Sequence, residues 1–419
     1  MSVNEETVEL VVERLNERVR KSNEVFLREI AKSIKQLRNL TPSEAHKLVQ
    51  ILKYGGKYEE IINEMSKLLN VNVKEINKIF RNYARNDQNF YKQFYEYRNI
   101  PMIPFDENNA IRTQTEALSA LAEKDLKRFT RTNVLGYTIS DSAKNGKILF
   151  KGLRETYNDV LDTAVLNVGQ GKETFDSAMN KVMKELGRSG LKTLEYESGR
   201  HIRLDSAVSM HIHDRLRELH NENQKIYGEE FGADGVEITV HENPAPDHED
   251  VQGRQFKIKE FEKLQKYGRA KDYTDKVINI HLTLKDQSEA KTFRPISEMN
   301  CYHYVLSIIL GVSKPQYTEK QLNKIRDNNR TGFYLYDKRT DKKIHYTNYD
   351  GTQLQRNIER KIREQKDIQL LAEESDNTNL VLESQNNIRI LIRQYKDLSE
   401  KSGLPMRLER LNVPDYRYK

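Results

Sequence analysis

RPISEMNCYHYVLSIILGVS, residues 294–313, places a cysteine and a histidine at the start of an apolar run. Cys301 is the only cysteine of the chain, and His303 lies two residues after it. A short apolar run such as 305–310 predicts a strand over 303–310 that is buried on both faces. Three interpretations of the Cys-x-His pair are open: half of a metal site, the nucleophile end of a catalytic pair, or a tightly packed turn.

A second polar stretch, HENPAPDHED at 241–250, offers further metal ligands. Cysteine and histidine are the residue types that zinc prefers. The candidate metal set is His241, His248, Cys301 and His303. The two segments would meet if the strands that carry them were neighbours, but their spacing matches no compact zinc signature. The preferred interpretation is a turn fixed by hydrogen bonds, with Cys301 a small buried hydrophobe and no cofactor, and zinc is the alternative.

Catalytic motifs are not found in the sequence. HExxH, GxSxG, Walker A and dinucleotide-binding fingerprints do not occur. A cysteine nucleophile also usually meets its histidine from a distant segment, not from two residues away. His211 and His213 point in different directions on a predicted helix and are interpreted as ordinary histidines. We therefore predict no enzymatic activity.

Composition and charge limit the classes of protein to which the chain can belong. With 419 residues, the chain has room for two or three domains. A single cysteine excludes an internal disulfide framework. The N-terminus is charged from its fifth residue, unlike a secretory signal, and no apolar stretch approaches the length of a membrane span. The net charge of +7, from 70 basic and 63 acidic residues, permits contact with DNA without requiring it.

The first half of the chain is predicted to be helical. One apolar stripe runs along residues 8–37 at helical spacing, and Thr41-Pro42-Ser43-Glu44 has the form of a capping box. Gly55-Gly56 ends that short helix, and a long helix is expected over 73–97. The two prolines of IPMIPF (100–105) then break the pattern. We assign 1–100 to a helical N-terminal region and 106–190 to a helical middle region.

In the second half of the chain, the sequence pattern changes near residue 191 from helical periodicity to a mixture of strand and helix signals. Residues 194–205 indicate a hairpin turning at Ser198-Gly199, followed by a helix over 206–231 and a strand around 236–240. A short helix over 255–267 and a strand over 277–284 complete an α+β core at 191–312. A Lys/Tyr-rich ribbon (314–350) and an antiparallel pair of helices, over 352–372 and 377–398, make up the region 313–419.

The chain is thus predicted to be an α+β protein that is mainly helical, with long N-terminal helices, a small β-containing core and a C-terminal helical hairpin. The ribbon carries the densest group of basic and tyrosine side chains. Its candidate DNA contacts are Lys338, Arg339, Lys342 and Lys343, with Tyr334, Tyr336 and Tyr346 beside them. Mixed-sign charge would keep nonspecific affinity for DNA weak and strongly salt-dependent.

Five stretches in the same order carry a family resemblance: SGRHIRLDSAVSMHIHD (198–214), ADGVEITVHENPAP (233–246), PAPDHEDVQGRQF (244–256), residues 294–322 and YDGTQLQRNIERKIREQK (349–366). They resemble the phage minor capsid protein 2 type, related to the MuF-like head-morphogenesis proteins. In that family a Pro/Asp/His loop and a later Asn-Cys/His turn mark the core. The matching residues here are Asp247, His248, Gly253, Asn300, Cys301 and His303.

The resemblance implies a structural minor head protein of a tailed phage. Such a protein would lie in the capsid interior or at the portal vertex, would assemble in the host cytoplasm, and would contact the portal protein and possibly packaged DNA, but no membrane. Two alternatives remain: a metal-dependent enzyme acting on nucleic acid or peptide, and a DNA-binding packaging or ejection factor. The working hypothesis is that the loop near 245 and the bend at Cys301 are neighbours in one compact scaffold.

Overall fold

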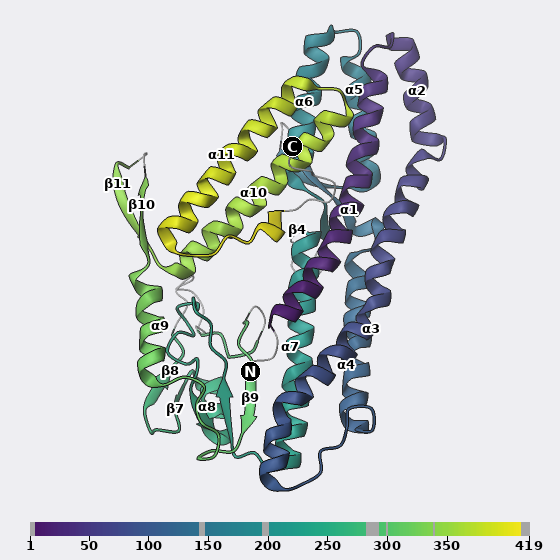
Figure 1. The fold of residues 1–419 in the computed structure, drawn as a ribbon. Helices are drawn as coiled ribbons and strands as arrows, with labels where there is room; N and C mark the ends of the chain where they lie inside the picture. The colour runs from purple at the N-terminus through teal and green to yellow at the C-terminus, as the bar shows by residue number, and fades with distance from the viewer. Residues whose placement is uncertain are drawn as a thin grey trace.

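Long helices make up most of the computed structural model (Figure 1). The structure describes residues 5–141, 147–194, 201–281, 293–298, 301–337 and 340–411. The helices are α1 (Glu5–Leu37), α2 (Pro42–Tyr54), α3 (Lys57–Arg98), α4 (Asn109–Phe129), α5 (Leu153–Asn167), α6 (Lys172–Ser189), α7 (Leu204–Phe231), α8 (Ile258–Tyr267), α9 (Glu319–Thr331), α10 (Asn348–Glu374) and α11 (Thr378–Ser402). The strands are β1 (Leu135–Asp141), β2 (Lys147–Gly152), β3 (Lys192–Leu194), β4 (His201–Arg203), β5 (Gly235–Ile238), β6 (Gln255–Lys257), β7 (Arg269–Lys271), β8 (Val277–Asn279), β9 (Val305–Ile308), β10 (Phe333–Asp337) and β11 (Lys342–Tyr346).

The predicted apolar stripe of the first helix is buried along its whole length. Its members are Val8, Val12, Leu15, Val19, Phe26, Ile30, Ile34 and Leu37. Helix α1 packs against α3, α7 and α10, so residues spaced by three or four positions all turn toward neighbouring helices. The stripe therefore confirms that amphipathic periodicity in this region encodes intramolecular packing.

The predicted start of α2 is confirmed in atomic detail. The Thr41 hydroxyl accepts the N–H of Glu44, and the Glu44 carboxylate accepts the N–H of Thr41. Pro42 occupies the first helical position. Helix α3 begins at Lys57, well before the predicted start at 73, and α3 and α4 pack together across the proline-containing break. Both helices thus belong to one bundle.

The middle region differs from its prediction, because a β-hairpin stands where helix was expected between α4 and α5. Strands β1 and β2 pair antiparallel and extend a sheet of order β2-β1-β3-β4. Tyr137 of β1 stacks on Phe26 of α1, with ring centroids 5.3 Å apart, and its hydroxyl donates to Asn23 Oδ1 at 2.7 Å. Tertiary packing on α1 therefore decides the conformation of this segment. The paired strands of the predicted hairpin near 198 are confirmed as β3 and β4, and its turn lies outside the described residues.

A small β-core lies beside the helical body, at the lower left of Figure 1. Its three-stranded antiparallel sheet has the order β6-β5-β9, and all four residues of β9 are buried, as predicted for the apolar run. The predicted helix at 255–267 is shorter, because residues 255–257 form β6 before α8 begins. The predicted strand at 277–284 is present as β8, which pairs with β7, and residues 282–284 lie outside the described part.

The C-terminal region contains one more helix than expected. Helix α9 occupies the first part of the predicted ribbon, and β10 and β11 form a two-stranded hairpin after it. The antiparallel pair of α10 and α11 is confirmed, with Asp376 in a left-handed conformation (φ 55°) between them. In Figure 1 the β10–β11 hairpin extends away from the body.

One continuous cluster of buried hydrophobic residues runs from α1 to the start of α11. It joins the predicted N-terminal and middle regions to α7, β9 and α10, while a second cluster fills the β-core. The mainly helical α+β class is therefore confirmed. The division into four regions stays a prediction. Within the described residues, no helix combines the length and the hydrophobicity that a membrane crossing requires.

Candidate functional site

The loop after β5 and the bend before β9 meet inside the protein. Cys301 Sγ lies 3.5 Å from Nδ1 of His248 and 3.5 Å from Nδ1 of His303. One ligand atom from each of the three residues lies within 4.8 Å of the other two. The three residues are 0%, 1% and 4% exposed for His248, Cys301 and His303. Antiparallel pairing of β5 with β9 brings these segments together, as the working hypothesis required.

Hydrogen bonds on the far side of each ring fix which nitrogen carries the proton. His248 Nε2 lies 2.6 Å from the carbonyl oxygen of Arg294, so Nε2 is the donor and Nδ1 presents a lone pair. Gln252 Oε1 accepts the backbone N–H of His241 at 2.8 Å and also faces His303 Nε2 at 3.3 Å. His303 must therefore donate from Nε2 as well. Both Nδ1 lone pairs face the same sulfur.

His248, Cys301 and His303 are called the corner below, and the electrostatics of this cluster follow from its burial. Burial lowers the pKa of His248 and lowers that of His303 well below its usual range, and the neighbouring imidazoles add to the effect on His303. Both rings are therefore neutral at pH 7. Burial raises the pKa of the Cys301 thiol, even though the Ser297 N–H donates to Sγ at 3.2 Å. A buried thiol of raised pKa is a poor nucleophile by itself.

Two arginines hold the segments that carry the corner. Arg294 donates two hydrogen bonds of 3.1 Å to the buried carboxylate of Asp247. Arg217 of α7 donates to the carbonyl oxygens of Ser297 and Cys301. These contacts give Asp247 a positioning role at the loop, in keeping with its place in the predicted signature.

Gly253, another signature residue, has a left-handed backbone with φ 70°. Its N–H donates to the Ile238 carbonyl oxygen at 2.8 Å, and a Cβ here would lie 2.4 Å from a Leu322 methyl carbon. Glycine is therefore required both by backbone conformation and by close packing. Asn300, the third signature residue, lies outside the described residues.

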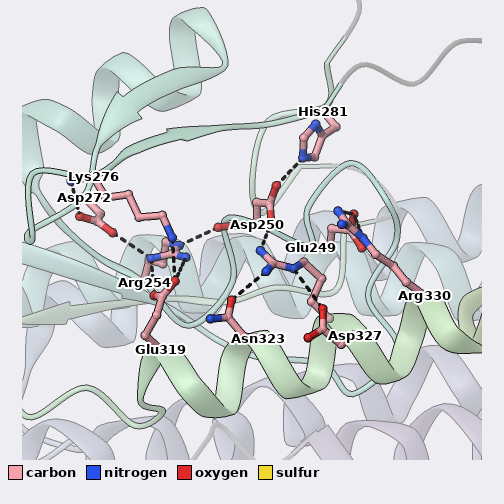
Figure 2. Close-up of polar contacts among 11 residues, drawn as sticks. Glu249, Asp250, Arg254, Asp272, Lys276, His281, Glu319, Asn323, Asp327 and Arg330 are labelled. Atoms are coloured by element: carbon pink, nitrogen blue, oxygen red, sulfur yellow. Dashed lines mark hydrogen bonds and ion pairs between the residues drawn. The ribbon is translucent and has the colours of Figure 1, made fainter.

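A network of charged side chains fastens the same loop to α9 from outside (Figure 2). Arg254 donates to Asp272 at 2.9 Å and to Glu319 at 2.9 Å, and its Nε donates to the carbonyl oxygen of Asp250 at 2.7 Å. The Arg254 and Asp272 side chains are buried, whereas Glu319 is half exposed. Loop, β-core and α9 are therefore joined through one guanidinium.

Further along α9, two more arginines reach the loop. Arg326 donates to Asp250 Oδ1 at 2.9 Å, and Arg330 donates to Glu249 at 2.5 Å. The other carboxylate oxygen of Asp250 lies 2.5 Å from His281 Nε2. His248 lies between Ala245 and Glu249 in this loop. The loop is held by α9 on one side and by the contacts around Cys301 on the other, so the position of His248 is fixed.

The remaining predicted site residues fall into three groups. His241 lies beside the corner, with its ring centroid 4.5 Å from that of His303. His211 and His213 pack separately, against Phe129 and Tyr302, which agrees with their interpretation as ordinary histidines. Lys342 and Lys343 are exposed on β11, and Lys338 and Arg339 lie outside the described residues.

Sequence reasoning missed the residues that surround the corner. Gln252 and Arg294 orient the two imidazoles. Both lie in stretches that carry the family resemblance, but neither was singled out as a site residue. The clamp by α9 was missed because the helix was not predicted. The signal for that helix was present: Thr318 and Gln321 form a capping box, which the sequence TEKQ encodes.

A family model described as Phage minor capsid protein 2 matches residues 3–399, nearly the whole chain. The match includes the helical body, the β-core and most of the C-terminal helical hairpin. No curated protein and no solved structure matches the chain. The chain therefore belongs to the phage minor capsid protein 2 family and is a structural protein of the phage head.

Proposed function

We propose that this member of the phage minor capsid protein 2 family serves at the portal vertex of a tailed-phage head. It would enter the head during assembly in the host cytoplasm and remain in few copies. The family match over 3–399 carries the proposal, because it assigns the whole helical body and the corner to a capsid protein. A scaffolding role also suits the buried corner, where the Cys301 thiol is only 1% exposed and has a raised pKa.

The β10–β11 hairpin supplies the contact surface for this role. Tyr334 and Tyr336 are 61% and 55% exposed and point to the same side of the ribbon, because they are two residues apart. Lys343 pairs with Tyr336 across the strands and His345 pairs with Tyr334, so all four side chains share one face. Tyrosine is enriched in protein-binding surfaces and among the residues that contribute most to binding.

The hairpin is held firmly at its base. Phe333 is buried, stacks on Tyr346 with ring centroids 5.9 Å apart, and packs close to Gly351 at the start of α10. A two-stranded ribbon is marginal in water by itself, so this anchoring is needed to keep its exposed end ordered. The proposed occupant of the tyrosine face is the portal protein, which would present an acidic or polar surface to Lys343.

A second candidate uses the same hairpin. Lys342 and Lys343 are exposed and adjacent to two exposed tyrosines, a combination that also suits nonspecific contact with nucleic acid. In that case the protein would act in packaging or ejection of the genome. The two candidates differ in the side chains that matter and in their response to salt.

The test is capture of this protein by purified portal protein. Replacing Tyr334 and Tyr336 together by alanine is expected to reduce capture strongly, while Tyr54→Ala, an exposed tyrosine of α2, leaves capture unchanged. If the wild-type chain is not captured, portal association is wrong. If the double variant is captured as well as the wild type, the hairpin is not the contact surface.

DNA binding is measured in parallel by fluorescence anisotropy with random-sequence duplex. Binding that falls steeply with salt and disappears in Lys342→Gln/Lys343→Gln would favour the packaging factor over the portal component. Portal capture that survives this charge-neutralising pair would favour the structural role.

A further inference from the structure

The three side chains of the corner are arranged as metal ligands. We propose that His248, Cys301 and His303 bind one zinc ion, with His241 lying beside the set. The proposal rests on this geometry alone and does not depend on where the protein lies in the head.

Hydrogen-bond counting gives the first argument. The Nδ1 atoms of His248 and His303 both present lone pairs to Cys301 Sγ, because their Nε2 atoms are committed as donors to the Arg294 carbonyl oxygen and to Gln252 Oε1. A thiol has one hydrogen and can donate to only one of them. The other lone pair would then be buried without a donor, which costs free energy. One cation between the three atoms satisfies both nitrogens and the sulfur.

The distances give the second argument. A zinc ion about 2.3 Å from sulfur and about 2.0–2.1 Å from nitrogen, at tetrahedral angles, places sulfur and nitrogen about 3.5–3.6 Å apart. Both Sγ–Nδ1 distances in the corner are 3.5 Å. Both sulfur–nitrogen distances therefore match those of a tetrahedral zinc site, and all three ligand atoms lie within 4.8 Å of one another.

The surroundings give the third argument. Histidines that bind a metal through one nitrogen commonly donate from the other to a backbone carbonyl or a side-chain oxygen, which fixes the ring. His248 and His303 both show this pattern, and the Ser297 N–H donates to Sγ at 3.2 Å, as suits a sulfur that carries negative charge. Two imidazole nitrogens and a small sulfur ligand match the preference of zinc for nitrogen and sulfur donors.

The ion would act as a structural cross-link. His248 and Cys301 are 53 residues apart in the chain, and the three ligands are at most 4% exposed. The ring of His241 lies edge-on to that of His303, with centroids 4.5 Å apart, but His241 is outside the group of ligand atoms within 4.8 Å of one another. To complete the four-ligand set that structural zinc sites use, its side chain would have to move toward the ion. Binding would release the Cys301 proton to solvent and leave a thiolate on the metal.

The experiment is metal analysis of the full chain, expressed with zinc supplementation and dialysed under reducing conditions. One zinc ion per chain is expected by plasma mass spectrometry, with substoichiometric zinc in Cys301→Ala and full zinc in His46→Ala, a histidine exposed on α2. Zinc retained in full by Cys301→Ala would overturn the proposal.

Cobalt substitution provides a test that needs no variant to fold. After zinc is removed with a chelator, Co²⁺ alone is added to the reduced wild-type protein. A sulfur-to-cobalt charge-transfer band is expected, because Cys301 is the only sulfur ligand of the set. A wild-type protein with neither stoichiometric zinc nor this band would refute the site. Failure of portal capture would leave both readouts unchanged, so the two proposals fail separately.

Discussion

Replacing Asp367 by asparagine should change the pH dependence of stability. Asp367 lies on α10 in the main core, where the amide of Asn23 donates to its carboxylate at 3.3 Å. Burial raises the pKa of Asp367 to about 7 against the attraction of Arg203. Its neighbour Asp205 behaves oppositely: burial opposes its ionisation, but Arg203 and Arg363 outweigh burial and hold its pKa well below the usual range.

The magnitude follows from linkage. A carboxyl group with a pKa near 3.9 in the unfolded chain and about 7 in the folded chain costs up to about 4 kcal/mol of stability once both states are ionised. Because the folded pKa is the higher one, this cost is absent below about pH 4, grows as the pH rises, and is complete above about pH 7. Asparagine cannot ionise, so Asp367→Asn should equal the wild type near pH 4 and exceed it by up to about 4 kcal/mol near pH 8.

The assay is urea denaturation followed by far-UV circular dichroism across this pH range. Asp397→Asn, an exposed aspartate that pairs with Lys401 on α11, is the matched control and should show no such pH dependence. A stability difference for Asp367→Asn that does not change with pH would refute the reasoning. A variant less stable than the wild type near pH 8 would show that Asp367 is ionised and held by Arg203.

Two further substitutions test the loop that carries His248. Gly253→Ala and Gly403→Ala share φ 70°, but only the first brings a Cβ within 2.4 Å of another side chain. Gly253→Ala should therefore lower the free energy of unfolding by about 1–3 kcal/mol more than Gly403→Ala in the urea assay, and equal losses would contradict the packing argument. Arg254→Ala leaves the buried Asp272 carboxylate without its guanidinium and should cost about 3 kcal/mol. Arg81→Ala, which breaks an exposed pair, should cost less than about 1 kcal/mol in thermal and urea unfolding, and comparable losses would show that the Arg254 network contributes little.

The sequence predicted those features whose physics is local or strongly periodic. The buried stripe from Val8 to Leu37 and the Thr41 capping box needed only helical spacing and cap chemistry. The approach of His248 to Cys301 was also predicted, from an apolar run beside a polar loop and from the family resemblance. In each case the deciding information lies within a few residues or in the order of the stretches that carry the family resemblance.

The features that were missed depend on distant partners. The β1–β2 hairpin forms where Tyr137 packs on Phe26, and the N–H of Thr138 donates to the Ser189 hydroxyl at 2.8 Å. None of these contacts can be read from the hairpin sequence itself. The orientation of the His303 imidazole by Gln252 has the same origin, because a glutamine acquires that role only after the sheet has formed.

Localised cryo-electron microscopy of the portal vertex in purified heads tests the placement of this protein at the portal. Density for the helical body is expected beside the portal, with the β10–β11 hairpin in contact with the portal protein. Density for this chain spread over the capsid shell away from the vertex, or a chain missing from purified heads, would contradict it.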